Sequence, residues 1–184
     1  MIYIVGSLIA VVLWIALAYN QLVKVRLHVR ESWSDIDTEL KRRYDLVPNL
    51  VATVQAYATH ERELLTRITA AREQALASTG SAARQATDEK PLVDGMRALF
   101  ARIEQYPDLK ASEQFLKLQE QLATTEDRIQ RARRFYNGNV RDLNTRVEVF
   151  PSNVVASMFG FQPEEFFEVE TSTIREVIDV SFEE

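Results

Sequence analysis

The first 20 residues contain an uncharged run that limits what this chain can fold into. Ile2 to Tyr19 reads IYIVGSLIAVVLWIALAY and carries no charged side chain. At about 1.5 Å of helical rise per residue the run spans roughly 27 Å, close to the thickness of the hydrocarbon core of a bilayer. Tyr3 and Tyr19 lie at its two ends, where interfacial aromatic residues are found. The run predicts a transmembrane anchor over residues 1–20 that contacts membrane lipid through residues 2–19.

A cleaved signal peptide is the alternative interpretation of this run. Such a peptide has basic residues before a shorter apolar stretch and a small-residue cleavage site after it. Ala16 and Ala18 could form that site, but no Lys or Arg precedes the run, and the helical pattern continues through Leu22. These features favour a retained anchor.

Basic residues around the run predict its orientation. Lys24, Arg26 and Arg30 follow it closely, and none precedes it. The positive-inside rule therefore places the remaining domain in the cytoplasm and the N-terminus outside, with a periplasmic domain as the alternative. Gly6 and Ala10 form a small-xxx-small pair, a weak sign of pairing between anchors in a homo-oligomer.

Composition narrows the class of the remaining domain. The formal net charge of −5 argues against nucleic-acid binding, which needs an excess of basic side chains. The absence of cysteine excludes disulfides and thiol nucleophiles. Only five glycines and five prolines occur, so long uninterrupted helices are expected.

Apolar residues recur at three- and four-residue spacing in four segments, as in amphipathic helices. Trp33 and Leu122 are expected to be buried core residues. We therefore predict an all-α fold in which the anchor helix continues into an antiparallel four-helix bundle with long helices, over residues 21–158, followed by a tail over 159–184. The four stripes contain Leu22, Val29, Trp33, Ile36 and Leu40; Val47, Leu50, Val54, Tyr57, Leu64, Ile68 and Ala71; Met96, Leu99, Ile103 and Tyr106; and Phe115, Leu118, Leu122, Thr125, Ile129, Ala132, Tyr136, Val140, Leu143 and Val147.

Proline sets the expected ends of these helices. Pro48 would clash with the carbonyl of Tyr44 in a continuous helix, and Asp45 could cap a new one, so a reversal is predicted near 44–45. A kinked continuous helix is the alternative. The small, polar stretch 78–91 predicts a loop, and Pro151 is expected to end the last long helix.

The predicted reversal would form an exposed tip for partner docking. Its candidate residues are Arg42, Arg43, Tyr44, Asp45, Pro48 and Asn49. A structural role for the same charges, at the ends of two helix dipoles, is the competing interpretation.

Several blocks of residues together resemble the LemA family. They are Glu31–Asp37 (ESWSDID), Leu40–Leu50 (LKRRYDLVPNL), Tyr57–Glu61 (YATHE), Ala71-Arg72, Arg133–Asn137 (RRFYN) and Phe150–Asn153 (FPSN). The resemblance covers the chain from the anchor to about Phe167, and Ser32 stands where the family is expected to have alanine. It implies a single-pass protein of the bacterial inner membrane with a helical bundle. It also implies either a membrane metallopeptidase as partner or a role in building membrane organelles.

The sequence gives little evidence for catalytic or metal-binding sites. His60-Glu61 lacks the second histidine that a His-Glu-x-x-His zinc site needs. The paired carboxylates lie on helical faces, where solvated positions are expected, and Arg131, Arg133 and Arg134 are expected to form such a solvated face as well. The chain is therefore predicted not to be an enzyme and to bind neither metal nor cofactor.

The function predicted from the sequence is that of a membrane-anchored scaffold or adaptor that binds or regulates a partner protein. The alternative is an architectural protein that associates with membranes and shapes them. If the helices alternate in direction, the tail returns to the membrane, and its aromatic residues could contact lipid or cap the bundle. Those residues are Phe159, Phe161, Phe166 and Phe167.

Overall fold

A single helix, α1 (Ile2–Tyr57), forms both the apolar N-terminal segment and the first helix of the bundle. The computed structural model describes residues 1–168, so the acidic end of the tail lies outside the described residues. The first part of α1 is long and apolar enough to cross a membrane, and none of that window is buried against the rest of the protein. An N-terminal helix that could anchor the protein in a membrane is thus continuous with the folded domain.

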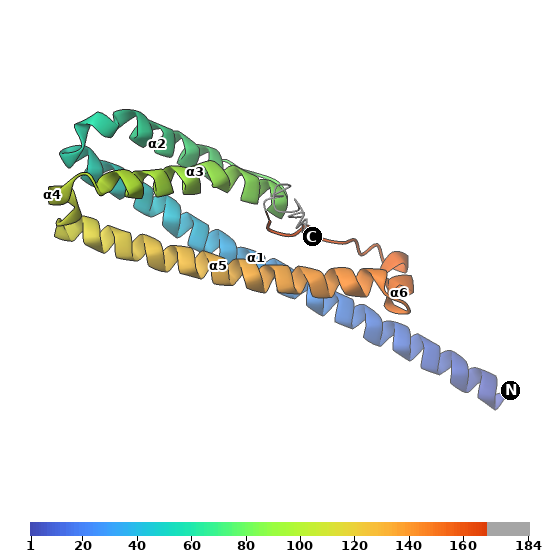
Figure 1. Cartoon of the computed structure of the whole chain (residues 1–184). Helices are drawn as coiled ribbons and strands as arrows, with labels where there is room; N and C mark the ends of the chain where they lie inside the picture. The colour runs from blue at the N-terminus through green and yellow to red at the C-terminus, as the bar shows by residue number, and fades with distance from the viewer. Residues whose placement is uncertain (169–184) are drawn as a thin grey trace, which may run out of the picture.

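The remaining helices run alternately along α1 (Figure 1). A short 3₁₀ turn (Thr59–Glu61) reverses the chain into α2 (Arg62–Leu76), and α3 (Ala82–Ile103) returns beside α2. The short α4 (Pro107–Lys110) leads into the long α5 (Glu113–Glu148), and α6 (Ser152–Met158) follows. The predicted all-α antiparallel bundle is confirmed, since α1, α2, α3 and α5 pack with alternating direction.

The core forms where the apolar stripes of the helices meet. Two helix pairs dominate the packing, α1 against α5 and α2 against α3, and α1 also packs on α2. Leu122 is buried as predicted, whereas Trp33 is only partly buried and packs against the rim of the core. The buried positions with the least exposure include Ile36, Leu50, Val54, Ile68, Leu92, Leu99, Leu109 and Val140.

The predicted reversal near residues 44–45 is wrong. The helix α1 continues through Pro48, as the alternative interpretation had it, and reverses only after Tyr57. The reversal lies about three helical turns later in the chain than predicted. The number of long helices and their alternating directions are nevertheless as predicted.

The predicted loop over residues 78–91 is also wrong from Ala82 onward. The hydroxyl of Ser81 accepts a hydrogen bond from the backbone N–H of Arg84, which caps α3. The first turns of α3 then bury Ala82, Ala86 and Glu89, and Pro91 lies inside the helix. This part of α3 shows little apolar pattern because small side chains and one glutamate take its core positions.

Helix α6 brings the end of α5 back to the anchor helix (Figure 1). Val155 and Ala156 of α6 and Phe161 pack with Leu22 in a small second core. Ile15 and Ala18 of α1 pack against this second core. The predicted return of Phe150 and Pro151 to the end of the bundle nearest the apolar segment is confirmed.

Candidate functional site

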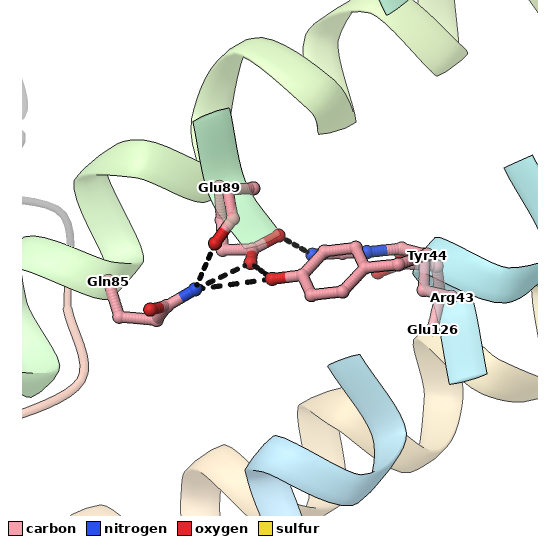
Figure 2. A network of polar contacts seen from close by, with 6 residues as sticks. Arg43, Tyr44, Gln85, Glu89 and Glu126 are labelled. Atoms are coloured by element: carbon pink, nitrogen blue, oxygen red, sulfur yellow. Dashed lines mark hydrogen bonds and ion pairs between the residues drawn. The ribbon is translucent and has the colours of Figure 1, made fainter. Parts of the chain in front are cut away.

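A buried guanidinium joins three of the four bundle helices. Arg43 of α1 is 2% exposed and donates to Glu89 of α3, and its Nη1 donates to Oε1 of Glu126 of α5 at 2.5 Å. Figure 2 shows the Glu89 carboxylate facing Arg43. Both terminal nitrogens of the guanidinium are thus paired, whereas its buried Nε has no hydrogen-bond partner among residues 1–168. Because loss of either pairing would leave a buried charge without compensation, these bonds hold α1, α3 and α5 together.

Tyr44 and Gln85 extend this network on the side of Glu89 (Figure 2). The Tyr44 hydroxyl donates to Glu89, and Nε2 of Gln85 donates to Oε1 of Glu89 at 2.9 Å and to the Tyr44 oxygen at 3.2 Å. Burial raises the pKa of the Glu89 carboxyl, and the neighbouring Arg43 offsets part of that rise. Glu89 is therefore a carboxylate whose charge depends on Arg43.

Next to this network, a side chain of α2 replaces the backbone hydrogen bond that Pro48 removes from α1. Proline has no N–H, so the carbonyl of Tyr44, four residues earlier, loses its helical hydrogen bond. Nε of Arg72, on α2, donates to this carbonyl oxygen at 2.6 Å. A side chain from the second helix thus supplies the bond that Pro48 removes and allows α1 to continue.

The polar network lies at the floor of an open seam between α3 and α5. A cleft of about 290 Å³ includes Arg43, Glu89 and Glu126 in its lining, together with Arg133 and Phe167. A second cleft of about 410 Å³ continues along the seam. Its lining comprises Val93, Met96, Arg97, Phe100, Gln119, Leu122, Ala123, Glu126 and Gln130.

The six residues of the predicted docking tip do not lie at a tip. They lie within the last third of α1, and two of them, Arg43 and Tyr44, are buried in the polar network. Arg42, Asp45, Pro48 and Asn49 are exposed on the side of the helix. Arg42 pairs there with Glu39, three residues earlier, at 3.0 Å. Docking of a partner on this part of α1 stays a prediction.

A second feature, the strap, consists of residues 159–168, which leave α6 and run back along α5. Asn144 makes a pair of hydrogen bonds to the backbone of Glu164, accepting from its N–H at 2.8 Å and donating to its carbonyl at 2.9 Å. Asn137, two turns earlier, forms the same kind of pair with Phe167, at 2.9 and 3.4 Å. The two asparagines hold the strap as a neighbouring strand would, and their seven-residue spacing is the sequence signal for it.

Aromatic packing completes the strap. The ring of Phe167 is buried, with its centroid 5.8 Å from that of Trp33, and the Trp33 and Tyr136 rings are 5.4 Å apart. The guanidinium of Arg133 lies 4.9 Å from the centroid of the Phe167 ring. The expectation of a solvated face is therefore wrong for Arg133, although Arg131 is exposed.

The four tail phenylalanines lie in different surroundings. Phe161 and Phe167 are buried and Phe166 is partly buried, whereas Phe159 is half exposed. The Phe159 ring lies 4.7 Å from that of Tyr19, at the end of the apolar segment. Lipid contact by this set stays a prediction, and Phe159 is the member with the exposure and position for it.

The His60-Glu61 pair lies in the turn at the far end of the bundle. Oε1 of Glu61 accepts a hydrogen bond from the Tyr106 hydroxyl at 3.2 Å and lies 3.9 Å from Arg102. Glu61 thereby fastens the α1–α2 turn to the end of α3. Within residues 1–168 no group of three or more potential metal-ligating side chains comes together.

Comparison with known proteins places the chain in a family. It is 29% identical to Protein LemA of Metamycoplasma hominis over 85% of this chain and 75% of that protein. It is 24% identical to the magnetosome protein MamQ of Magnetospirillum gryphiswaldense, over 88% of this chain and 68% of that protein. It is 23% identical to the magnetosome protein MamQ 2 of Paramagnetospirillum magneticum over 91% and 71%. The sequence model of the LemA family matches residues 32–182, and the chain therefore belongs to the LemA family.

Proposed function

We propose that this protein is a membrane-anchored helical scaffold that holds a partner protein at a fixed distance from the bilayer. The observation that carries the proposal is the continuity of α1, which joins the exposed apolar segment to the bundle core with no loop between them. A flexible linker would let the bundle diffuse about its anchor. A continuous helix instead fixes the distance and direction of the bundle relative to the transmembrane segment.

The α3–α5 seam is the surface that best suits a protein partner. It combines apolar side chains, such as Met96 and Phe100, with the charged Arg97 and Glu126 in one open cleft. Interfaces that form and dissociate share this mixture of apolar and polar surface. A membrane metallopeptidase as the partner, in a bacterial inner membrane, is an expectation from the family resemblance.

Photo-crosslinking of the full chain in its native membranes tests this proposal. Benzoylphenylalanine at Gln119 or Gln130, both exposed along the seam, should give one discrete adduct with another protein. The same probe at Asp37 or Lys41, exposed on α1, is the matched control and should not give that adduct. Equal labelling from all four sites, or none from the seam, would contradict the assignment of the seam.

An architectural role in shaping membranes is the second candidate. Two observations favour it, namely the relatives named as magnetosome proteins and the apolar surface around α6. The full chain reconstituted at increasing density should then reduce the diameter of vesicles seen by electron cryomicroscopy. Diameters independent of protein density would remove this candidate.

A further inference from the structure

The chain around α6 exposes apolar surface that the bundle does not use. Residues 149–163 contain no charged side chain, in a protein in which 27% of residues are charged. Phe150 is 77% exposed and Met158 is 63% exposed, and Val149, Val154 and Phe159 are each about half exposed. Contiguous apolar exposure of this kind marks a binding surface in a folded protein.

The other face of α6 packs on α1, and this packing places the exposed apolar surface beside the apolar segment of α1. Pro151 and Ser152 line a cleft together with Arg146 of α5 and with residues of α1 that range from Trp14 and Leu17 to Leu22. Farther along, Phe161 packs on Tyr19, with ring centroids 5.9 Å apart, and lies under the guanidinium of Arg26 at 4.6 Å. The turn between α5 and α6 therefore reaches the level of residues 14–17, and the chain leaves α6 at the level of residues 19–26.

The position of the α5–α6 turn along α1 is incompatible with a bilayer that leaves this turn in water. If the turn at Pro151 stayed in water, the apolar segment of α1 would contribute only residues 2–13 to the membrane span. They rise about 18 Å at about 1.5 Å per residue, well short of a hydrocarbon core of about 30 Å. The full segment, residues 2–19, rises roughly 27 Å and does match the core. A bilayer that covers the whole segment therefore also covers the turn and the outer face of α6.

We propose that the α5–α6 turn and α6 form a membrane-embedded foot, comprising residues 149–159, that lies in the interfacial layer beside the transmembrane segment. The inference rests on the proposed anchor. Its occupant is lipid, with the headgroup-proximal parts of the acyl chains against Phe150, Val154 and Met158. The depth fits, since residues 14–17 lie about 3–8 Å below Tyr19, and interfacial helices bury their apolar face by about 5–10 Å.

Charge supports the same placement. Residues 149–163 carry none, whereas Lys24, Arg30 and Arg141 are exposed on the adjoining parts of α1 and α5 farther from the N-terminus. Nearer the foot, Arg146 pairs with Asp142 at 3.2 Å, and the exposed Glu148 marks the edge of the uncharged stretch. Basic side chains at that level would meet the headgroups of anionic lipids. The foot gives the protein a second attachment to the bilayer and limits rotation of α1 about its own axis.

Site-directed spin labelling of the full chain tests the foot. The sequence has no cysteine, so single-cysteine variants can each carry one nitroxide. Labels at Phe150→Cys and Met158→Cys are compared with Phe135→Cys, a phenylalanine 62% exposed on the middle of α5, and with Leu8→Cys in the apolar segment. The variants are reconstituted in vesicles of phosphatidylethanolamine and phosphatidylglycerol. Power saturation then measures how often each nitroxide collides with lipid-soluble oxygen and with a water-soluble nickel complex.

The foot predicts a ratio of oxygen to nickel collisions severalfold higher at Phe150 and Met158 than at Phe135, and approaching that at Leu8. If Leu8 is in lipid but both foot labels behave like Phe135, the foot is wrong and the anchor stands. If Leu8 itself collides with nickel, the anchor fails and the foot with it. If the foot labels are shielded from both reagents, protein covers the surface and the lipid assignment is wrong. Unchanged helical circular dichroism establishes that each variant is folded.

Discussion

At the scale of single residues, Arg43 of α1 forms ion pairs with one carboxylate of α3 and one of α5. Its guanidinium is buried between Glu89 and Glu126. Loss of one partner from such a group is costly because the remaining charges stay buried without compensation, whereas replacing the whole group with apolar side chains can be neutral. The network should therefore respond very differently to single and paired substitutions.

Replacing Arg43 with methionine should reduce the free energy of unfolding by about 3–5 kcal/mol, because Glu89 then stays buried without its cation. The double variant Arg43→Met/Glu89→Met should lose less than Arg43→Met alone. Chemical denaturation of the full chain in detergent micelles measures both. Arg42→Met, at an exposed pair with Glu39, is the matched control and should lose no more than about 1 kcal/mol.

The loss in Arg43→Met should also depend on pH. Burial raises the pKa of Glu89 above its ordinary value, so the folded state binds a proton there more readily than the unfolded state does. That contribution to stability is complete below the ordinary pKa near 4.5 and disappears as the pH rises through the raised value. The deficit of Arg43→Met should shrink from pH 7 toward pH 5, and a constant deficit would show that Glu89 is not its cause.

Tyr136 gives a separate pH signature at the alkaline end. Burial raises the pKa of its hydroxyl to about 12, with Glu164 and Glu165 contributing, and the hydroxyl donates to the carbonyl of Glu165 at 2.9 Å. Because the pKa is raised in the folded state, stability is intact below pH 10 and falls between pH 10 and 12. Tyr136→Phe should flatten that fall in alkaline unfolding measurements, while Tyr57→Phe, at a half-exposed tyrosine, should not.

The residue-level pattern of the sequence predicted the aliphatic core well and the polar core poorly. Leu22, Ile36 and Leu122 follow helical spacing, and all are buried. Glu89 occupies a core position of α3 but is a charged side chain, so hydrophobic spacing alone classifies it as surface. Its partner Arg43 lies 46 residues away, and nothing in local sequence links the two.

At the scale of elements, Arg72 of α2 stabilises the continuation of α1 through Pro48. It donates to the Tyr44 carbonyl that Pro48 leaves without a helical partner. Arg72→Met should cost about 1.5–3 kcal/mol, the range for a hydrogen bond from a charged donor. In a Pro48→Ala background the backbone can supply the bond again, and the cost of Arg72→Met should fall.

A thermodynamic cycle over these two positions measures the coupling directly. Arg67→Met, at an exposed arginine on the same helix, serves as the control and should be indifferent to the residue at position 48. Equal costs of Arg72→Met in both backgrounds would mean that Arg72 stabilises the bundle by another contact.

The strap offers a second test at this scale. Asn137→Ala should speed hydrogen exchange of the Phe167 amide, and Asn144→Ala that of the Glu164 amide, because each asparagine oxygen accepts from that N–H. Loss of a hydrogen bond worth about 1 kcal/mol corresponds to roughly fivefold faster exchange. Asn139→Ala removes a bond to the His28 carbonyl instead and should leave both amides unchanged.

The elements themselves were predictable from sequence, but two of their ends were not. Helical spacing identified four long helices, and Pro151 ends α5 where expected. Pro48 was misleading because the bond that rescues its helix comes from Arg72, on a different helix. The start of α3 was hidden because alanines and Glu89 line its buried face, and tertiary packing overrides local propensity there.

At the scale of the whole molecule, the basic residues after the apolar segment predict which side of the membrane holds the bundle. Lys24, Arg26 and Arg30 should keep it in the cytoplasm. A reporter that is active only outside the cytoplasm, fused after Glu184, should be silent, and a cytoplasmic reporter at the same point should be active. The opposite pair of results would place the bundle in the periplasm.

The continuity of α1 has a consequence for how the bilayer acts on the far end of the molecule. From Tyr19 to Tyr57 the helix extends about 57 Å at about 1.5 Å per residue. Transmembrane helices tilt by about 20° on average, and they tilt further as a bilayer thins around them. A tilt of that size would swing the Tyr57 end sideways by about 20 Å. A change in bilayer thickness around the anchor should therefore displace the turn held by Glu61 and Tyr106 sideways.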